Sequence, residues 1–170
     1  MVKQNVIRIV WFSLVVAWMV LIFALSAQES QVSSNLSGGV IDRLMRVFMS
    51  DFVKLPDAER VMLIDGLQNA VRKGAHAAAY FVLGALLTGA MHTFEALRTK
   101  IRLLAAFAVA VAYAASDELH QMFVPGRSCS IKDVLIDAIG AGAGIAAMVA
   151  ILRIGEAFQG RKKMRRSQCS

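Results

Sequence analysis

The chain has 170 residues, of which 57% are hydrophobic and 18% charged, and its mean hydropathy is +0.57. A soluble domain of this length does not need so much apolar surface, so the composition favours a membrane protein over a soluble helical bundle. The net charge of +7 comes without a folded basic module, which argues against nucleic acid as a partner.

Four apolar runs follow one another along the chain and cover residues 9–28, 74–94, 103–124 and 134–152. Each is close to the about 20 residues that a helix needs to cross a bilayer, and helices satisfy their own backbone groups in lipid. The sequence therefore predicts an all-α, polytopic membrane protein with four transmembrane helices in a single domain, residues 1–170. A cleaved signal peptide is an alternative for the first run, whose apolar stretch exceeds the usual core of about 7–15 residues.

The segment 29–72 between the first two runs is too long for a structureless connection. Apolar residues recur at helical spacing within 40–48, and a second segment of this kind begins at Pro56. We expect two amphipathic helices here, which either lie on the outer membrane surface or fold over the polar residues described below.

The distribution of charge predicts the orientation. Residues 1–8, 95–102 and 153–170 together carry 11 basic residues and 2 acidic ones. Because short loops rich in lysine and arginine stay in the cytoplasm, we expect a multi-pass protein of the cytoplasmic (inner) membrane with both termini cytoplasmic. The basic tail, 153–170, is expected to touch anionic lipid headgroups. Cys129 and Cys169 then fall on opposite sides of the membrane and cannot pair within one chain.

The unusual polar residues gather at the outer ends of the runs, where helical spacing groups them into three stripes. An ionisable side chain in a spanning helix costs about 2.5–3.5 kcal/mol on insertion scales, so such a cluster indicates a functional site. The stripes are Lys73, His76 and Tyr80; Tyr113, Asp117, His120 and Gln121; and Asp133, Asp137, Gly140 and Gly144. The two glycines have the small-xxx-small spacing that lets a neighbouring helix approach closely. His92, at the inner end, is expected to stand alone.

Taken in order, these polar signatures resemble the VanZ-like family over about residues 9–150. The matching residues are Phe23, Ser26, Gln28 and Ser30; Arg72, Lys73, His76, Tyr80, Leu83 and Gly84; Asp117, Glu118, His120, Gln121, Phe123, Val124, Pro125, Gly126 and Arg127; and Asp133, Val134 and Gly140. The chain departs from the family at Asp137, where asparagine is usual. The resemblance implies a small polytopic membrane protein of the cell envelope in a family named for a member that lowers susceptibility to the antibiotic teicoplanin.

The residue types suggest recognition of a phosphate-bearing lipid or cell-envelope intermediate. Arginine and lysine bind phosphate oxygens, imidazole exchanges a proton near neutral pH, and a carboxylate orients the imidazole. The candidate catalytic residues are His76, His120, Asp117 and Asp133. The candidate substrate-binding residues are Arg72, Lys73, Tyr80, Glu118, Gln121, Arg127 and Asp137.

Other interpretations remain open. His76, His120 and a carboxylate are a possible metal site, although their spacing matches no metal motif, and we assign no metal ligand. The polar residues also suit a non-catalytic scaffold, held by a structural network of ion pairs. Enzyme and binder are not distinguished, no cofactor is indicated, and the oligomeric state is undetermined. The expected partners are membrane lipids and a lipid-linked cell-wall or glycan intermediate.

Overall fold

The computed structural model describes residues 2–28, 30–49, 51–125 and 129–168, and the described part contains helices and no strands. The elements are α1 (Val2–Ser26), α2 (Ser30–Phe48), the short 3₁₀ helix η1 (Phe52–Lys54), α3 (Asp57–His92), α4 (Thr99–Gln121) and α5 (Ile131–Gln168). The predicted all-α fold class is confirmed.

Four of these helices, α1, α3, α4 and α5, are long and apolar enough to cross a membrane, as the sequence predicted. Large apolar side chains such as Val16, Phe107 and Ile139 stay exposed. An outward apolar face on a helix that bonds its own backbone is what a lipid environment requires. The fold is therefore that of a membrane protein with four spans.

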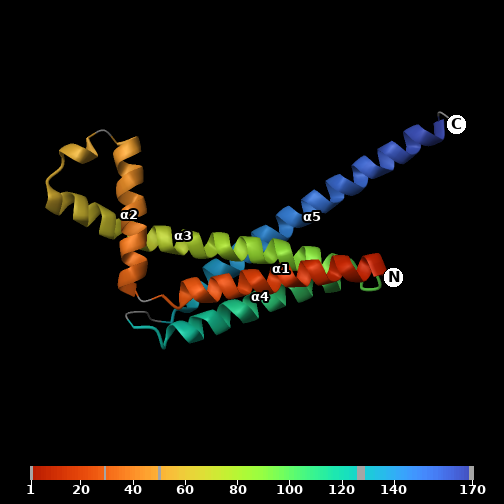
Figure 1. Cartoon of the computed structure of the whole chain (residues 1–170), viewed down its shortest axis with the longest axis horizontal. Helices are drawn as coiled ribbons and strands as arrows, with labels where there is room; N and C mark the ends of the chain where they lie inside the picture. The colour runs from red at the N-terminus through yellow and green to blue at the C-terminus, as the bar shows by residue number, and fades with distance from the viewer. Residues whose placement is uncertain (1, 29, 50, 126–128, 169–170) are drawn as a thin grey trace.

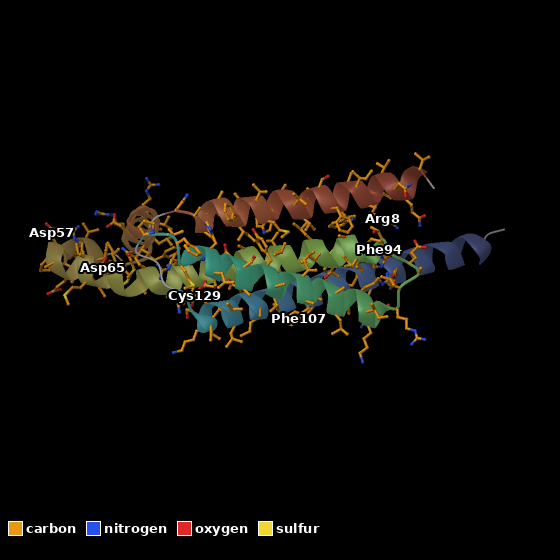
Figure 2. The ribbon with its side chains drawn as sticks, turned by 90° about the horizontal axis from the view of Figure 1, so that it is seen from below. Arg8, Asp57, Asp65, Phe94, Phe107 and Cys129 are labelled. Atoms are coloured by element: carbon orange, nitrogen blue, oxygen red, sulfur yellow. The ribbon has the colours of Figure 1, made fainter. Side chains whose placement is uncertain are left out.

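The four long helices run alternately in opposite directions, and α3 lies among the others (Figure 1). Helix α5 packs along α3 and also contacts α4, whereas α1 packs mainly on α3. Helix α2 runs across the bundle and packs on α3, where Gly38 faces Ile64 and Gln68. Figure 2 shows Asp57 near this α2 end of the bundle, and Arg8 and Phe94 at the opposite end, which we call the N-terminal end.

Helices α3 and α5 touch through their backbones at three glycines. A Cβ atom added to Gly140 would collide with the carbonyl of Ala77, and one added to Gly144 would collide with that of Phe81. Gly84 faces α5 in the same way. Small residues allow this approach in membrane helices, as predicted for Gly140 and Gly144. The contact sets the first turns of α5 beside the middle of α3.

Helix α1 is attached to the bundle in part by side chains that donate hydrogen bonds to backbone carbonyls. The Trp18 indole donates to the carbonyl of Ala79 on α3 at 2.9 Å. The Tyr113 hydroxyl on α4 donates to the carbonyl of Met19 at 2.5 Å. In a medium without water such bonds are favoured, because the donor has no alternative partner. They bring the end of α1 close to α3 and α4.

The prediction of two separate amphipathic helices in 29–72 is wrong in its second part. Residues after Pro56 do not form a helix of their own but the first turns of α3, which continues without interruption to His92. No proline follows Pro56 in this helix, and a helix tolerates an interior glycine such as Gly66 or Gly74 at a cost of about 1 kcal/mol.

Among the described residues of this segment, α2 is the one separate α-helix, and the short η1 follows it. It buries Ile41 and leaves Val40, Leu44 and Phe48 exposed. Arg46 donates to Asp42 one turn away at 2.7 Å, and this hydrogen bond lowers the pKa of the Asp42 carboxyl. An i, i+4 pair of this kind supports a short helix.

Candidate functional site

Polar side chains from four helices meet at the α2 end of the bundle. We call this group the polar end cluster. Its described members are Ser26 on α1; Lys73, His76 and Tyr80 on α3; Asp117, Glu118, His120 and Gln121 on α4; and Asp133 and Asp137 on α5.

Two pairs of a basic and an acidic side chain join α3 to the start of α5. Nζ of Lys73 lies 2.8 Å from Oδ1 of Asp133, and both side chains are partly exposed. One turn further in, Nδ1 of His76 lies 3.7 Å from Oδ2 of Asp137, which is longer than a hydrogen bond. The first and third predicted stripes therefore face each other, because the glycine contact sets the register of the two helices.

Asp117 is buried where α4 meets the end of α1. Its Oδ2 accepts a hydrogen bond from Oγ of Ser26 at 2.8 Å and a longer one from Nε2 of Gln121 at 3.4 Å. Its Oδ1 has no hydrogen-bond partner among the described residues. Burying a carboxylate oxygen without a hydrogen bond costs free energy of folding. Oδ1 of Asp117 is therefore an acceptor that a ligand could use.

Glu118, next in sequence, is also buried but bonds in another direction. Its Oε2 accepts the backbone N–H of Ser130 at 2.9 Å, just before α5 begins. Adjacent helical residues point about 100° apart, so one carboxylate faces α1 and the other faces the start of α5. Glu118 thus holds the connection between α4 and α5 against the cluster.

The two candidate histidines have different surroundings. The His120 ring stacks on Phe23 of α1, with centroids 4.4 Å apart and planes at 31°, whereas His76 lies beside Asp137. His120 Nε2 is buried and has no hydrogen-bond partner in the described part of the chain. Within 2–28, 30–49, 51–125 and 129–168, no three His, Cys, Asp or Glu side chains are arranged to hold a metal ion.

Tyr80 lies deeper than the sequence suggested. It is fully buried in the apolar core, and its ring centroid is 6.3 Å from that of Tyr113. Its hydroxyl bonds to no group that the structure describes. Tyr80 therefore belongs both to the polar end cluster and to the apolar core.

Arg127 and Arg72 are the two predicted arginine ligands, and the structure describes only the second. Arg127 lies outside the described residues, as does the rest of 126–128, so its predicted reach over the helix ends stays a prediction. Arg72 is half-buried next to Lys73 on α3. Cys129, the first described residue after 126–128, is exposed and carries a free thiol.

Ser26 is the member of the cluster that was not among the predicted site residues. Its hydroxyl is almost completely buried and forms the shortest bond to Asp117, from a helix 91 residues away in sequence. The available signal was its place at the end of the first run, within the segment that resembles the family.

Comparison with known proteins places the chain at the level of a family. No curated protein matches the chain, and no solved structure matches it. A family model described as VanZ/LLP1 matches residues 11–153, which include the second and third spans, most of the first and fourth, and every described member of the polar end cluster. The chain therefore belongs to the VanZ/LLP1 family.

Proposed function

We propose that the polar end cluster binds the phosphate-bearing head of a lipid-linked cell-envelope intermediate at the outer face of the cytoplasmic membrane. The observation that supports this best is the Lys73–Asp133 ion pair at the accessible edge of the cluster, 2.8 Å long. A lysine in such a pair can exchange a protein carboxylate for a ligand phosphate without movement of the helices.

Exposure divides the candidate residues into two groups. The side chains of Lys73, Asp133 and His76 keep 40%, 28% and 23% of their surface, so contact with a ligand falls to them. Asp137 keeps 1% and acts through its neighbour His76. In the bound state Lys73, with Arg72 beside it, contacts phosphate oxygens. Asp133, released from Lys73, accepts hydroxyl hydrogens from the attached glycan.

His76 adds the capacity for proton exchange near neutral pH. A buried carboxylate 3.7 Å behind an accessible imidazole is a geometry that can position a general acid or base once a ligand closes the site. Catalysis is thus a separable part of the proposal. Binding without turnover would leave a binding protein in which Asp137 keeps the His76 ring in place.

The direct experiment measures binding of a polyprenyl phosphate and of a lipid-linked glycan to the full chain in nanodiscs. The wild type is expected to bind both, and Lys73→Gln to bind about tenfold more weakly, because a charge-assisted contact contributes about 1.5–3 kcal/mol. Lys132→Gln is the matched control, since it removes the same charge from an exposed neighbour of Asp133. Folded protein that binds neither lipid would refute the proposal.

We extend the proposal to lowered sensitivity to teicoplanin, the property for which the family is named. Cells that produce the chain are expected to grow at higher teicoplanin concentrations than cells that produce Lys73→Gln at equal levels in the membrane. Equal growth of the two strains would separate the lipid-binding role from any effect on the antibiotic.

The alternative is a non-catalytic scaffold, and one set of contacts favours it. Ser26 with Asp117 and Lys73 with Asp133 each join two helices, and Glu118 joins α4 to the amide of Ser130 just before α5. Polar contacts between membrane helices average only about 0.6 kcal/mol, so the network is a weak means of holding four helices together. Loss of folded protein in Lys73→Gln would support the scaffold, whereas normal folding with lost binding would support the site.

A further inference from the structure

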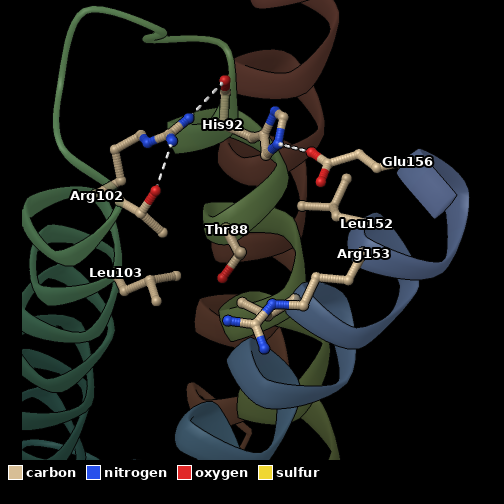
Figure 3. Close-up of a pocket in the computed structure, with 9 residues that line it drawn as sticks. Thr88, His92, Arg102, Leu103, Leu152, Arg153 and Glu156 are labelled. Carbon is tan, nitrogen blue, oxygen red and sulfur yellow. Dashed lines mark hydrogen bonds and ion pairs between the residues drawn. The ribbon is translucent and has the colours of Figure 1, made fainter. Parts of the chain in front are cut away.

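A second polar site lies at the N-terminal end of the bundle, away from the polar end cluster. Here α3, α4 and α5 enclose a cavity of about 190 Å³ (Figure 3). Arg102 and Arg153 line it together with His92, and its apolar wall includes Leu103 and Leu152. The cavity therefore combines cationic and apolar surface at the level where α3 ends and α4 begins.

Arg102 is held in place by the end of α3. Its Nη1 donates to the carbonyl of His92 at 3.2 Å, and its Nη2 donates to Oγ1 of Thr99 at 3.0 Å. A guanidinium has five N–H donors, so these two bonds leave others for a ligand. Its Nε has no hydrogen-bond partner in the part of the chain that the structure describes. The Arg102 guanidinium is thus held in a fixed position and still has N–H groups that make no hydrogen bond within the described structure.

Arg153 supplies a second cation from the opposite wall. Its guanidinium points into the cavity beside Thr88 (Figure 3) and forms no hydrogen bond or ion pair with a residue that the structure describes. The nearby acid, Glu156, instead lies 3.8 Å from Nε2 of His92. The lining of the cavity therefore carries two guanidinium groups and one carboxylate, which lies close to His92. Its net charge is positive.

The role of Arg102 at the end of α3 does not explain the whole arrangement. A cation that bonds the last carbonyls of a helix stabilises that helix, and this accounts for Arg102. It accounts neither for Arg153, which approaches from α5, nor for the apolar wall of Leu103, Val149 and Leu152. An arginine pair beside apolar side chains at a membrane boundary matches an amphiphile with a phosphate head.

We propose that this cavity binds the phosphate group of an anionic phospholipid, with Arg102 and Arg153 on the phosphate oxygens and the acyl chain against Leu103 and Leu152. In the predicted orientation the lipid belongs to the cytoplasmic leaflet. The site is separate from the polar end cluster, and the inference does not depend on the function proposed there.

The test uses the full chain in detergent and measures retention of phosphatidylglycerol by native mass spectrometry. Arg153→Gln is the informative variant, since the described structure shows no hydrogen bond or ion pair of Arg153 that its loss would break. Each of Arg153→Gln and Arg102→Gln is expected to weaken binding about fivefold, and the double variant about 25-fold. Lys100→Gln, which removes a charge at the same end outside the cavity, is the control and is expected to change binding less than about twofold.

Two further probes define the ligand. Diacylglycerol, which lacks the phosphate, is expected to be lost on purification, and glycerol 3-phosphate, which lacks the chains, is expected to bind more weakly than the lipid. Equal retention of diacylglycerol would overturn the role of the phosphate, and equally tight glycerol 3-phosphate would overturn the role of the lipid. If Arg153→Gln and Lys100→Gln act alike, the effect is general surface charge and the proposed site does not exist.

Discussion

Ser26 and Asp117 share a buried hydrogen bond of 2.8 Å that joins the last residue of α1 to the final turns of α4. Among the described residues, it is the hydrogen bond through which α1 enters the polar end cluster. The bond connects α1, which packs least among the four spans, to the carboxylate in the α4 stripe. Substitution of Ser26 therefore tests how strongly the first span is coupled to the polar end cluster.

Ser26→Ala is expected to lower the stability of the protein in detergent by about 1–3 kcal/mol, because it leaves a buried carboxylate oxygen with only the longer bond from Gln121. Thermal unfolding of the purified chain measures this. Ser13→Ala, an exposed serine on the same helix, is the control and should change little. Equal melting temperatures for the two variants would show that the Ser26 bond contributes nothing.

Gly144→Ala is expected to destabilise the protein by about 1–3 kcal/mol, since a methyl group would collide with the carbonyl of Phe81 and push α5 away from α3. Gly155→Ala is the matched control on the same helix, because a Cβ there meets nothing within 4 Å. The control is expected to be neutral or stabilising by up to about 1 kcal/mol. The prediction fails if both alanines behave alike in thermal unfolding.

Asp137→Asn is expected to keep the fold and to raise the stability by about 1 kcal/mol, because an amide costs less to bury than a carboxylate that the described residues leave without a hydrogen bond. Thermal unfolding of the variant checks the sign. A fall in stability would mean that the attraction between Asp137 and His76 outweighs the cost of burial. Binding of the polyprenyl phosphate by the same variant reports separately on the role of Asp137 behind His76.

Cys129 gives a direct test of the predicted orientation, because its thiol is exposed at the α2 end. In intact cells a membrane-impermeant maleimide is expected to label the wild type but not Cys129→Ser. The variant, which keeps Cys169 in the basic tail, should be labelled only after the membrane is opened. Labelling of Cys129→Ser in intact cells would place the tail outside and reverse the topology.

The four spans and the close approach of a helix at Gly140 and Gly144 were predictable because each depends on local spacing, whereas the identity of that helix, α3, comes from the structure. Runs of about 20 apolar residues require spanning helices. Gly140 and Gly144 lie on one helix face with Asp137, so close packing at the glycines carries Asp137 to the neighbouring helix. The meeting of Lys73 with Asp133 follows from the same register.

Contacts between distant helices were not predictable from spacing. Nothing in the periodicity of α1 indicates that Ser26 meets Asp117, or that Phe23 stacks on His120 and turns it toward α1. The start of α3 was misplaced because the second span was bounded by its apolar run, whereas the helix extends through the charged residues before it to Asp57. His92 was expected to stand alone, yet it lies close to Glu156 and its carbonyl accepts from Arg102, a residue of the next helix.

The uninterrupted course of α3 separates the two ends of the molecule by a fixed length. His76 and His92 lie 16 positions apart on one helix, which at 1.5 Å per residue is about 24 Å. This distance is most of the thickness of a hydrocarbon core, which is about 30 Å. Because the two histidines are so far apart, a lipid headgroup at one of them cannot reach the other. Defects from substitutions at the two ends should therefore fall into two independent classes, and a variant carrying one of each should show both defects side by side.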